Sequence, residues 1–146
     1  ALRTHNWSPR YESNPSMLLQ GKTALILGYG AIGQYVAKIL KAVDMRILTI
    51  RRNHTVGSDD NTQIFPINAL SRLLPQADVL IIALPGTLET EGLIGKSELS
   101  LLPEGAVLVN IGRGPIVDAE ALYQALKERH LRAVYHPRTV GRAKQP

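Results

Sequence analysis

The sequence contains no cysteine, only one tryptophan and one phenylalanine, and no apolar run of the length that crosses a membrane. A membrane-spanning helix needs about 20 consecutive apolar residues. The lack of cysteine excludes a disulfide framework and leaves a cytoplasmic location unopposed. The first residues also lack the apolar core of a secretory signal peptide. With 45% hydrophobic and 20% charged residues, the composition is that of a globular protein. We therefore expect a cytoplasmic location and no membrane partner.

Acidic residues are outnumbered by basic ones, and the formal net charge is +5. A basic balance favours anionic partners, of which a phosphate-rich dinucleotide is one. Nucleic acid is disfavoured as a partner, because the basic residues are scattered and aromatic residues make up only 5% of the chain. The four histidines do not have the spacing of a metal site, so no metal is expected.

The 146 residues suit one domain with its own core, flanked by two segments of different composition. Residues 1–20 contain proline, serine and asparagine without periodicity, which predicts an N-terminal arm or linker. Residues 21–134 alternate strand-like and helix-like segments and form the expected dinucleotide-binding domain. Residues 135–146 are basic and acid-free, and they predict a tail.

The alternation within residues 21–134 is typical of a Rossmann-type α/β fold, a doubly wound parallel sheet with helices on both faces. We expect about five strands in this arrangement, with truncation near a sixth strand that should begin in residues 131–134. The expected strands are residues 23–28, 46–51, 62–67, 78–84 and 106–112. The expected helices are residues 34–43, 68–77, 96–102 and 118–129, the last of them capped by Asp118.

A glycine-rich loop joins the first expected strand to the first expected helix. Gly28, Gly30 and Gly33 have the G-x-G-x-x-G spacing of a dinucleotide-binding turn. The first glycine permits the tight turn, the second lets a pyrophosphate approach the backbone, and the third lets the helix pack on the strand. The intervening residues contribute mainly backbone amides, which point at the phosphates from the start of the helix. These intervening residues are Tyr29, Ala31 and Ile32.

No carboxylate follows the second expected strand, where an NAD site has an acid for the adenosine ribose. Residues 48–54 read LTIRRNH. Arginine at this place can pair with the 2′-phosphate of NADP, whereas an acid would repel it. Arg51 and Arg52 therefore favour NADP over NAD. The alternative is NAD binding through Asn53 or backbone groups.

Four segments extend the pattern far beyond the glycine loop: LQGKTALILGYGAIG, ALPGTLETEGLIG, SELSLLPEGAVLVNIGRGPIVDAEALYQAL and LKERHLRA. In this order and spacing they resemble the nucleotide-binding domain of the D-isomer-specific 2-hydroxyacid dehydrogenases. The resemblance covers most of residues 19–133. It implies a hydride transfer between a nicotinamide cofactor and a 2-oxo or 2-hydroxy acid, and a homodimer formed through this domain.

The resemblance also implies roles for individual residues. Arg113 matches the family arginine that binds the substrate carboxylate and polarises its carbonyl, a task that suits a permanently charged planar guanidinium. Gly86 stands where the family has a larger residue. The positions that match the nicotinamide side of the crevice are Leu84, Pro85, Thr87, Ile111 and Gly112.

Two catalytic parts of the family pattern find no match in this chain. The family pairs an imidazole acid–base with a glutamate, and neither the G-x-D-x-x-x-x-E-P nor the T-P-H setting occurs here. The substrate domain also has no counterpart. We expect His5, His54, His130 and His136 to lie outside the catalytic machinery. The chain is thus predicted to bind a cofactor without full catalytic capacity of its own, and the alternative is a non-catalytic nucleotide- or partner-binding module on the same fold.

Overall fold

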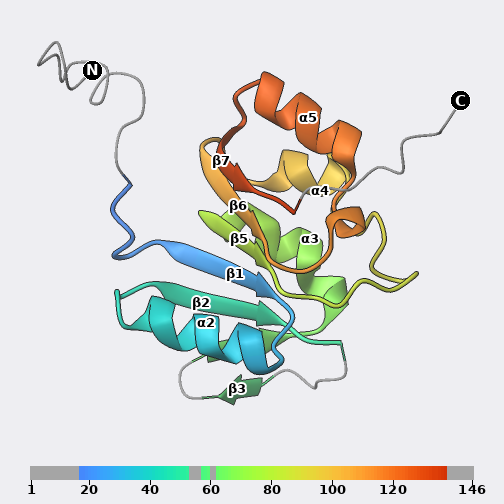
Figure 1. Cartoon of the computed structure of the whole chain (residues 1–146). Helices are drawn as coiled ribbons and strands as arrows, with labels where there is room; N and C mark the ends of the chain where they lie inside the picture. Colours follow the sequence, from blue (N-terminus) through green and yellow to red (C-terminus); the bar gives the residue numbers. More distant parts are fainter. Residues whose placement is uncertain (1–16, 53–56, 60–61, 138–146) are drawn as a thin grey trace, which may run out of the picture.

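The strands of the chain assemble into one sheet in the order β3-β4-β2-β1-β5-β6-β7 (Figure 1). The computed structural model describes residues 17–52, 57–59 and 62–137. Six of the strands run parallel, and β3 pairs antiparallel with β4 at one edge. The strand bounds are β1 Thr23–Leu27, β2 Arg46–Ile50, β3 Gly57–Asp59, β4 Thr62–Phe65, β5 Val79–Ile82, β6 Ala106–Asn110 and β7 Leu131–Tyr135.

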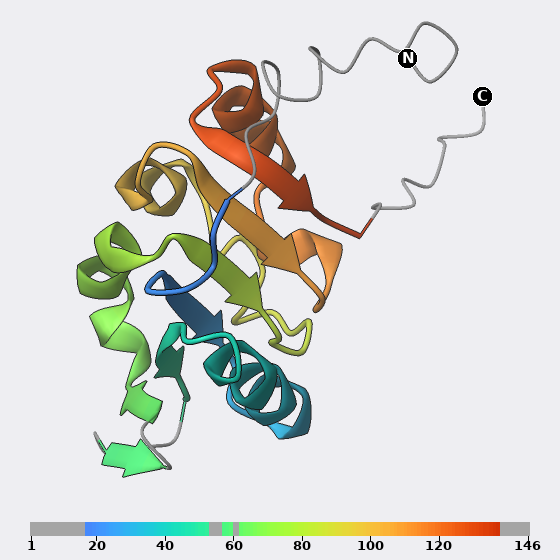
Figure 2. The ribbon, with the colours of Figure 1, turned by 90° about the vertical axis from the view of Figure 1, so that its left-hand side faces the viewer.

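Helices cover both faces of the sheet (Figure 2). On one face lies α2 (Ala31–Lys41), and on the other lie α3 (Leu70–Leu73), α4 (Lys96–Leu101) and α5 (Ala119–Lys127). None of the helices in the described part of the chain is long and apolar enough to cross a membrane. The Asp118 carboxylate accepts a hydrogen bond of 2.7 Å from the Ala121 N–H and so caps α5.

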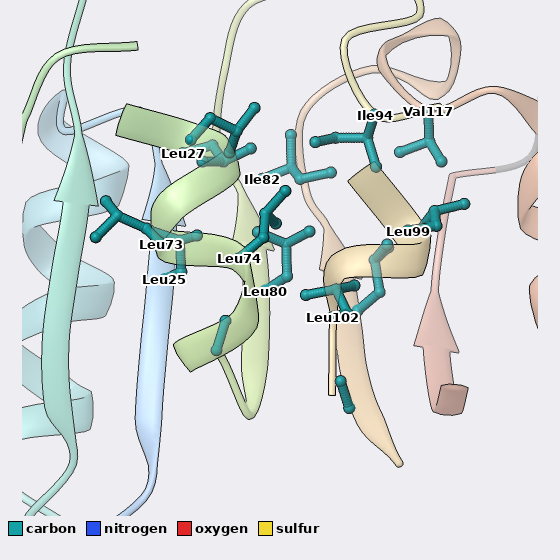
Figure 3. Close-up of a cluster of buried hydrophobic side chains, with 14 of the residues drawn as sticks. Leu25, Leu27, Leu73, Leu74, Leu80, Ile82, Ile94, Leu99, Leu102 and Val117 are labelled. Atoms are coloured by element: carbon teal, nitrogen blue, oxygen red, sulfur yellow. The ribbon is translucent and has the colours of Figure 1, made fainter. Parts of the chain in front are cut away.

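The sequence of β1 explains why two helical layers are needed. Successive side chains of a strand point to opposite faces, and every residue of β1 is buried. Leu25 and Leu27 belong to the larger hydrophobic cluster beneath α3, α4 and α5, which Figure 3 shows. Ala24 and Ile26 belong to the second cluster, beneath α2. The central strand is therefore stable only when both faces are covered.

The expected fold class is confirmed, and three details differ from the expectation. The sixth parallel strand forms, since β7 runs from Leu131 to Tyr135 beside β6, one residue into the expected tail. A seventh strand, β3, extends the other edge. The expected helix over residues 68–77 is broken into a short α3 between two 3₁₀ turns, and Pro75 lies in the second turn.

Parallel strands place their carboxyl ends at one edge of the sheet, and ligands of open α/β folds bind outside that edge. Helix α2 begins there at Ala31, three residues before the expected start. Gly33 lies in its first turn, and a Cβ at this position would overlap the carbonyl oxygen of Gly28. The absence of a side chain at Gly33 thus permits the approach of α2 to β1.

Gly33→Ala tests this close approach. The obstructing atom belongs to the backbone, so we expect the free energy of unfolding to fall by about 1–3 kcal/mol, the usual cost of overpacking. The matched control is Gly30→Ala, because a Cβ on Gly30 meets no heavy atom within 4 Å. Gly30 is the N-cap residue of α2, where alanine is less favourable than glycine, so the loss for Gly30→Ala should stay below about 1 kcal/mol. Urea denaturation followed by circular dichroism measures both, and equal losses would contradict the packing argument.

Candidate functional site

Gly28 holds three strand ends together at the middle of the sheet edge. Its N–H donates a hydrogen bond of 2.9 Å to the carbonyl of Ile50, at the end of β2. A Cβ on Gly28 would lie 2.7 Å from the carbonyl oxygen of Ala83, just beyond β5. Its φ of +101° also lies in a region that side chains disfavour. Glycine is therefore required where the chain leaves β1.

The start of α2 has the properties of an anion cradle. Gly30 is the exposed N-cap residue, no side chain caps the helix, and the first turn carries no acid. The first N–H groups of a helix have no intrahelical acceptor and form the positive end of its dipole. Ala31 and Ile32 are exposed beside this end, whereas the Tyr29 side chain is buried beneath α2. The loop thus offers backbone amides and an open space at Gly30, which fits a dinucleotide pyrophosphate.

Arg51 and Arg52 follow β2 directly, on one side of the glycine loop. Both side chains are exposed. The Arg51 N–H donates to the carbonyl of Phe65, which ties the backbone to the end of β4. The Arg52 guanidinium forms an ion pair of 2.5 Å with Glu89, in the loop after β5. Asn53 and His54 lie outside the described residues.

The loops after β5 and β6 meet on the other side of the glycine loop. The N–H groups of Ile111 and Gly112 both donate to the carbonyl of Ile82, at 2.9 and 3.1 Å. A Cβ on Gly112 would lie 2.5 Å from the carbonyl oxygen of Leu84, so this glycine also permits a close backbone approach. Leu84, Ile111 and Gly112, three of the positions expected on the nicotinamide side, therefore lie close together.

The loop after β5 is stabilised by its own threonines. The Thr90 hydroxyl donates to the carbonyl of Pro85 at 2.8 Å and accepts from the N–H of Thr87 at 2.9 Å. These bonds hold the loop in a defined turn, although most of its side chains are exposed.

Arg113 lies at the rim of a cavity of about 550 Å³ between the same two loops. A Cβ on Gly86 would lie 2.7 Å from the Arg113 Cγ, which explains why a residue without a side chain faces it. The exposed guanidinium donates one long hydrogen bond, of 3.3 Å, to the Gly112 carbonyl. Its remaining donors can bind a carboxylate in a bidentate fashion. The cavity is lined by Gly86, Thr87, Leu88, Thr90, Glu91, Arg113, Pro115 and Ile116.

Asn110 organises the turn that carries Arg113. The fully buried amide accepts a hydrogen bond from the Gly112 N–H and donates one to the Arg113 carbonyl, both at 3.0 Å. The amide NH₂ also lies 3.3 Å from Nδ1 of His136. Sequence reasoning assigned Asn110 no role, although a polar residue that ends an apolar strand is the signal that points to it.

His136 belongs to residues 135–146, which the sequence analysis assigned to a basic tail, and the structure describes its surroundings. It directly follows β7 and reaches the Asn110 amide at the sheet edge. Since two backbone groups fix the orientation of that amide, the His136 Nδ1 must accept, and the neutral ring carries its proton on Nε2. Burial lowers the pKa of the His136 imidazole below its ordinary value of 6.5.

Within the described residues, the other histidine, His130, lies outside this site. His130 approaches the carbonyl of Leu99 near α4, with its Nε2 at 3.1 Å. His5 lies outside the described residues, as does His54. The described residues contain no group of three or more metal-binding side chains.

The lowered pKa of His136 predicts a pH dependence of stability. Below pH 6.5 the unfolded state binds this proton more readily than the folded state, so the stability contribution is present above pH 6.5 and is lost as the pH falls below it. His136→Asn retains an acceptor for Asn110 and removes the titration. We expect urea midpoints between pH 7.5 and about 5.5 to fall more in the wild type than in this variant. Parallel pH profiles would contradict the assignment.

Comparison with known proteins identifies the family. The sequence model described as "D-isomer specific 2-hydroxyacid dehydrogenase, NAD binding domain" matches residues 1–136. The glyoxylate reductase of Thermococcus gammatolerans is 44% identical over 108 residues, which cover 74% of this chain and 32% of that protein. The glyoxylate reductase of Aeropyrum pernix is 44% identical over 126 residues, covering 84% and 37%. The chain thus spans about a third of the length of these relatives.

Solved structures agree with the sequence comparison. A glyoxylate reductase from Paecilomyes thermophila superimposes with a TM-score of 0.76 at 31% identity, covering 92% of this chain and 41% of that one. An NAD-dependent formate dehydrogenase from Staphylococcus aureus, in complex with NAD, gives a TM-score of 0.78 at 30% identity, covering 88% and 38%. The chain therefore belongs to the D-isomer-specific 2-hydroxyacid dehydrogenase family, as its NAD-binding domain.

Proposed function

We propose that this chain binds NADP in preference to NAD, and that it forms the cofactor half of an enzyme that interconverts 2-oxo and 2-hydroxy acids. The observation that carries the proposal is the arrangement at the sheet edge. The Gly28–Gly33 loop leads into the start of α2. Two arginines follow β2 on one side of this loop, and the turn with Arg113 lies on the other side. The similarity to glyoxylate reductases supports a small 2-oxo acid as the substrate.

Two basic residues support the preference for NADP. Arg51 and Arg52 are exposed where the adenosine ribose of a Rossmann site is bound, and residues 48–54 contain no acid that would bind a 2′-hydroxyl. A guanidinium pairs well with a phosphate because its planar donors match the phosphate oxygens. The alternative, NAD binding through Asn53, is an outcome of the titration below.

At the opposite end, Arg113 is proposed to orient the substrate carboxylate and to polarise the adjacent carbonyl. The bound nicotinamide supplies the hydride. Reduction of the carbonyl also needs a proton. Within the described part of the chain, His136 is engaged with Asn110 and His130 lies near α4. We therefore assign the role of proton donor to neither of these two histidines.

A titration with NADPH and NADH, followed by nicotinamide fluorescence, tests the proposal. We expect saturable binding of both cofactors, with a lower Kd for NADPH. Gly30→Ala should raise both Kd values by about tenfold or more, because its Cβ occupies the space through which the pyrophosphate approaches the amides. Tighter binding of NADH would contradict the NADP preference, and no saturable binding would contradict the function. Incubation with glyoxylate and NADPH should give no turnover above background.

We also propose that the chain pairs with a second copy of itself, and an apolar stripe on α2 supports this homodimer. Ile32, Tyr35 and Ile39 are 62%, 67% and 50% exposed and recur at helical spacing along the outer side of α2, with Val43 just beyond its end. Exposed apolar patches of this kind often mark contact surfaces. Light scattering should show concentration-dependent association, which Ile39→Lys weakens. Leu88→Lys, at a 92% exposed position outside α2, is the matched control and should leave the association unchanged. A wild type that stays monomeric would contradict the proposal.

A further inference from the structure

One ion pair crosses the proposed cofactor crevice. Arg52 follows β2, and Glu89 lies in the loop after β5. In the sheet, β1 lies between these two strands. Adjacent strands are about 4.8 Å apart, so the two side chains together bridge roughly 10 Å above the carboxyl end of β1. This is the place where the Gly28–Gly33 loop begins.

The loop geometry holds Glu89 in this position. Thr87 and Thr90 flank it, and their hydrogen bonds to each other and to Pro85 stabilise the turn. The glutamate is therefore carried by an ordered segment and faces Arg52 from a fixed backbone. The ion pair itself is solvent-exposed, with 70% and 63% of the two side chains accessible. Exposed pairs of this kind are weak and can be displaced by a competing anion.

Competition at Arg52 affects the two cofactors differently. The 2′-phosphate of NADP brings close to two negative charges to the end of β2, and it must share or displace the Glu89 carboxylate to use Arg52. The two anions also repel each other at this short range. NAD carries a 2′-hydroxyl instead and leaves the Arg52–Glu89 pair intact. Within the described residues, Arg51 forms no such ion pair. Its guanidinium can therefore pair with the phosphate without displacing a carboxylate.

We propose that Glu89 is a specificity-determining residue that weakens the preference for NADP by engaging Arg52. This inference rests on the proposed binding of NAD(P) at the glycine loop. It assigns the main phosphate contact to Arg51 and makes Arg52 a second contact that Glu89 restrains. Glu89 thus acts on the adenosine end of the cofactor although it belongs to the loop on the nicotinamide side.

Glu89→Gln removes the charge and keeps the side-chain size. We expect the Kd for NADPH to fall about three- to tenfold, in line with the loss of one surface ion pair and one like-charge contact. The Kd for NADH should change less than about twofold, because its ribose carries no phosphate. Glu104→Gln is the matched control. It makes the same change of charge at an exposed residue before β6, at the opposite end of the sheet, and should leave the NADPH-to-NADH ratio unaltered.

Two further measurements distinguish an effect of Glu89 that acts through Arg52 from a general effect of its negative charge. In an Arg52→Gln background, Glu89→Gln should lose most of its effect on NADPH, since the proposed coupling acts through Arg52. Isothermal titration with 2′,5′-ADP and 5′-AMP should reproduce the selectivity change without the nicotinamide half. An unchanged NADPH-to-NADH ratio in Glu89→Gln, or an equal effect with and without Arg52, would overturn the inference while cofactor binding persists. Absence of saturable binding by the wild type would overturn the proposed function as well.

Discussion

The candidate site depends on the contact between α2 and β1 at Gly33 and Gly28. Without a side chain at Gly33, the helix begins directly over the end of the central strand. Gly28 in turn lies against Ala83 and bonds to Ile50, so three strand ends converge at this corner. The position of the α2 amides relative to the arginines after β2 follows from this backbone contact, because neither segment can shift without opening the packed corner.

A second corner, around Asn110, positions the other half of the crevice. Its buried amide connects the end of β6, the turn with Arg113 and the end of β7 through three polar contacts. Both corners contact the end of β5, because Gly28 packs against the Ala83 carbonyl and the Ile82 carbonyl accepts from the N–H groups of Ile111 and Gly112. Backbone hydrogen bonds and small residues therefore place the charged side chains, which are themselves exposed and would not order the loops on their own.

Three arginines form two regions of positive charge at the carboxyl edge of the sheet. Arg51 and Arg52 provide positive charge beside the end of β2, and Arg113 provides it beside the turn after β6. Positive charge at such an edge attracts anionic ligands. Glu89 introduces one negative charge between these regions and pairs with only one of the three arginines in the described structure.

The sequence by itself determined strands β1, β2, β4, β5 and β6, the glycine loop and the positions of the arginines after the strands. These features can be predicted from short-range sequence patterns, namely apolar runs, glycine spacing and the residues that end a strand. The tertiary structure decided that Arg52 pairs with Glu89, that His136 reaches Asn110 across 26 residues, and that residues 131–135 complete a sixth parallel strand. Strand β7 is largely exposed and has little apolar pattern of its own. It forms because the backbone of β6 provides hydrogen-bonding partners along its free edge. Contacts between residues distant in the chain leave no local pattern, since their energy arises only when the sheet has brought both partners to the same edge.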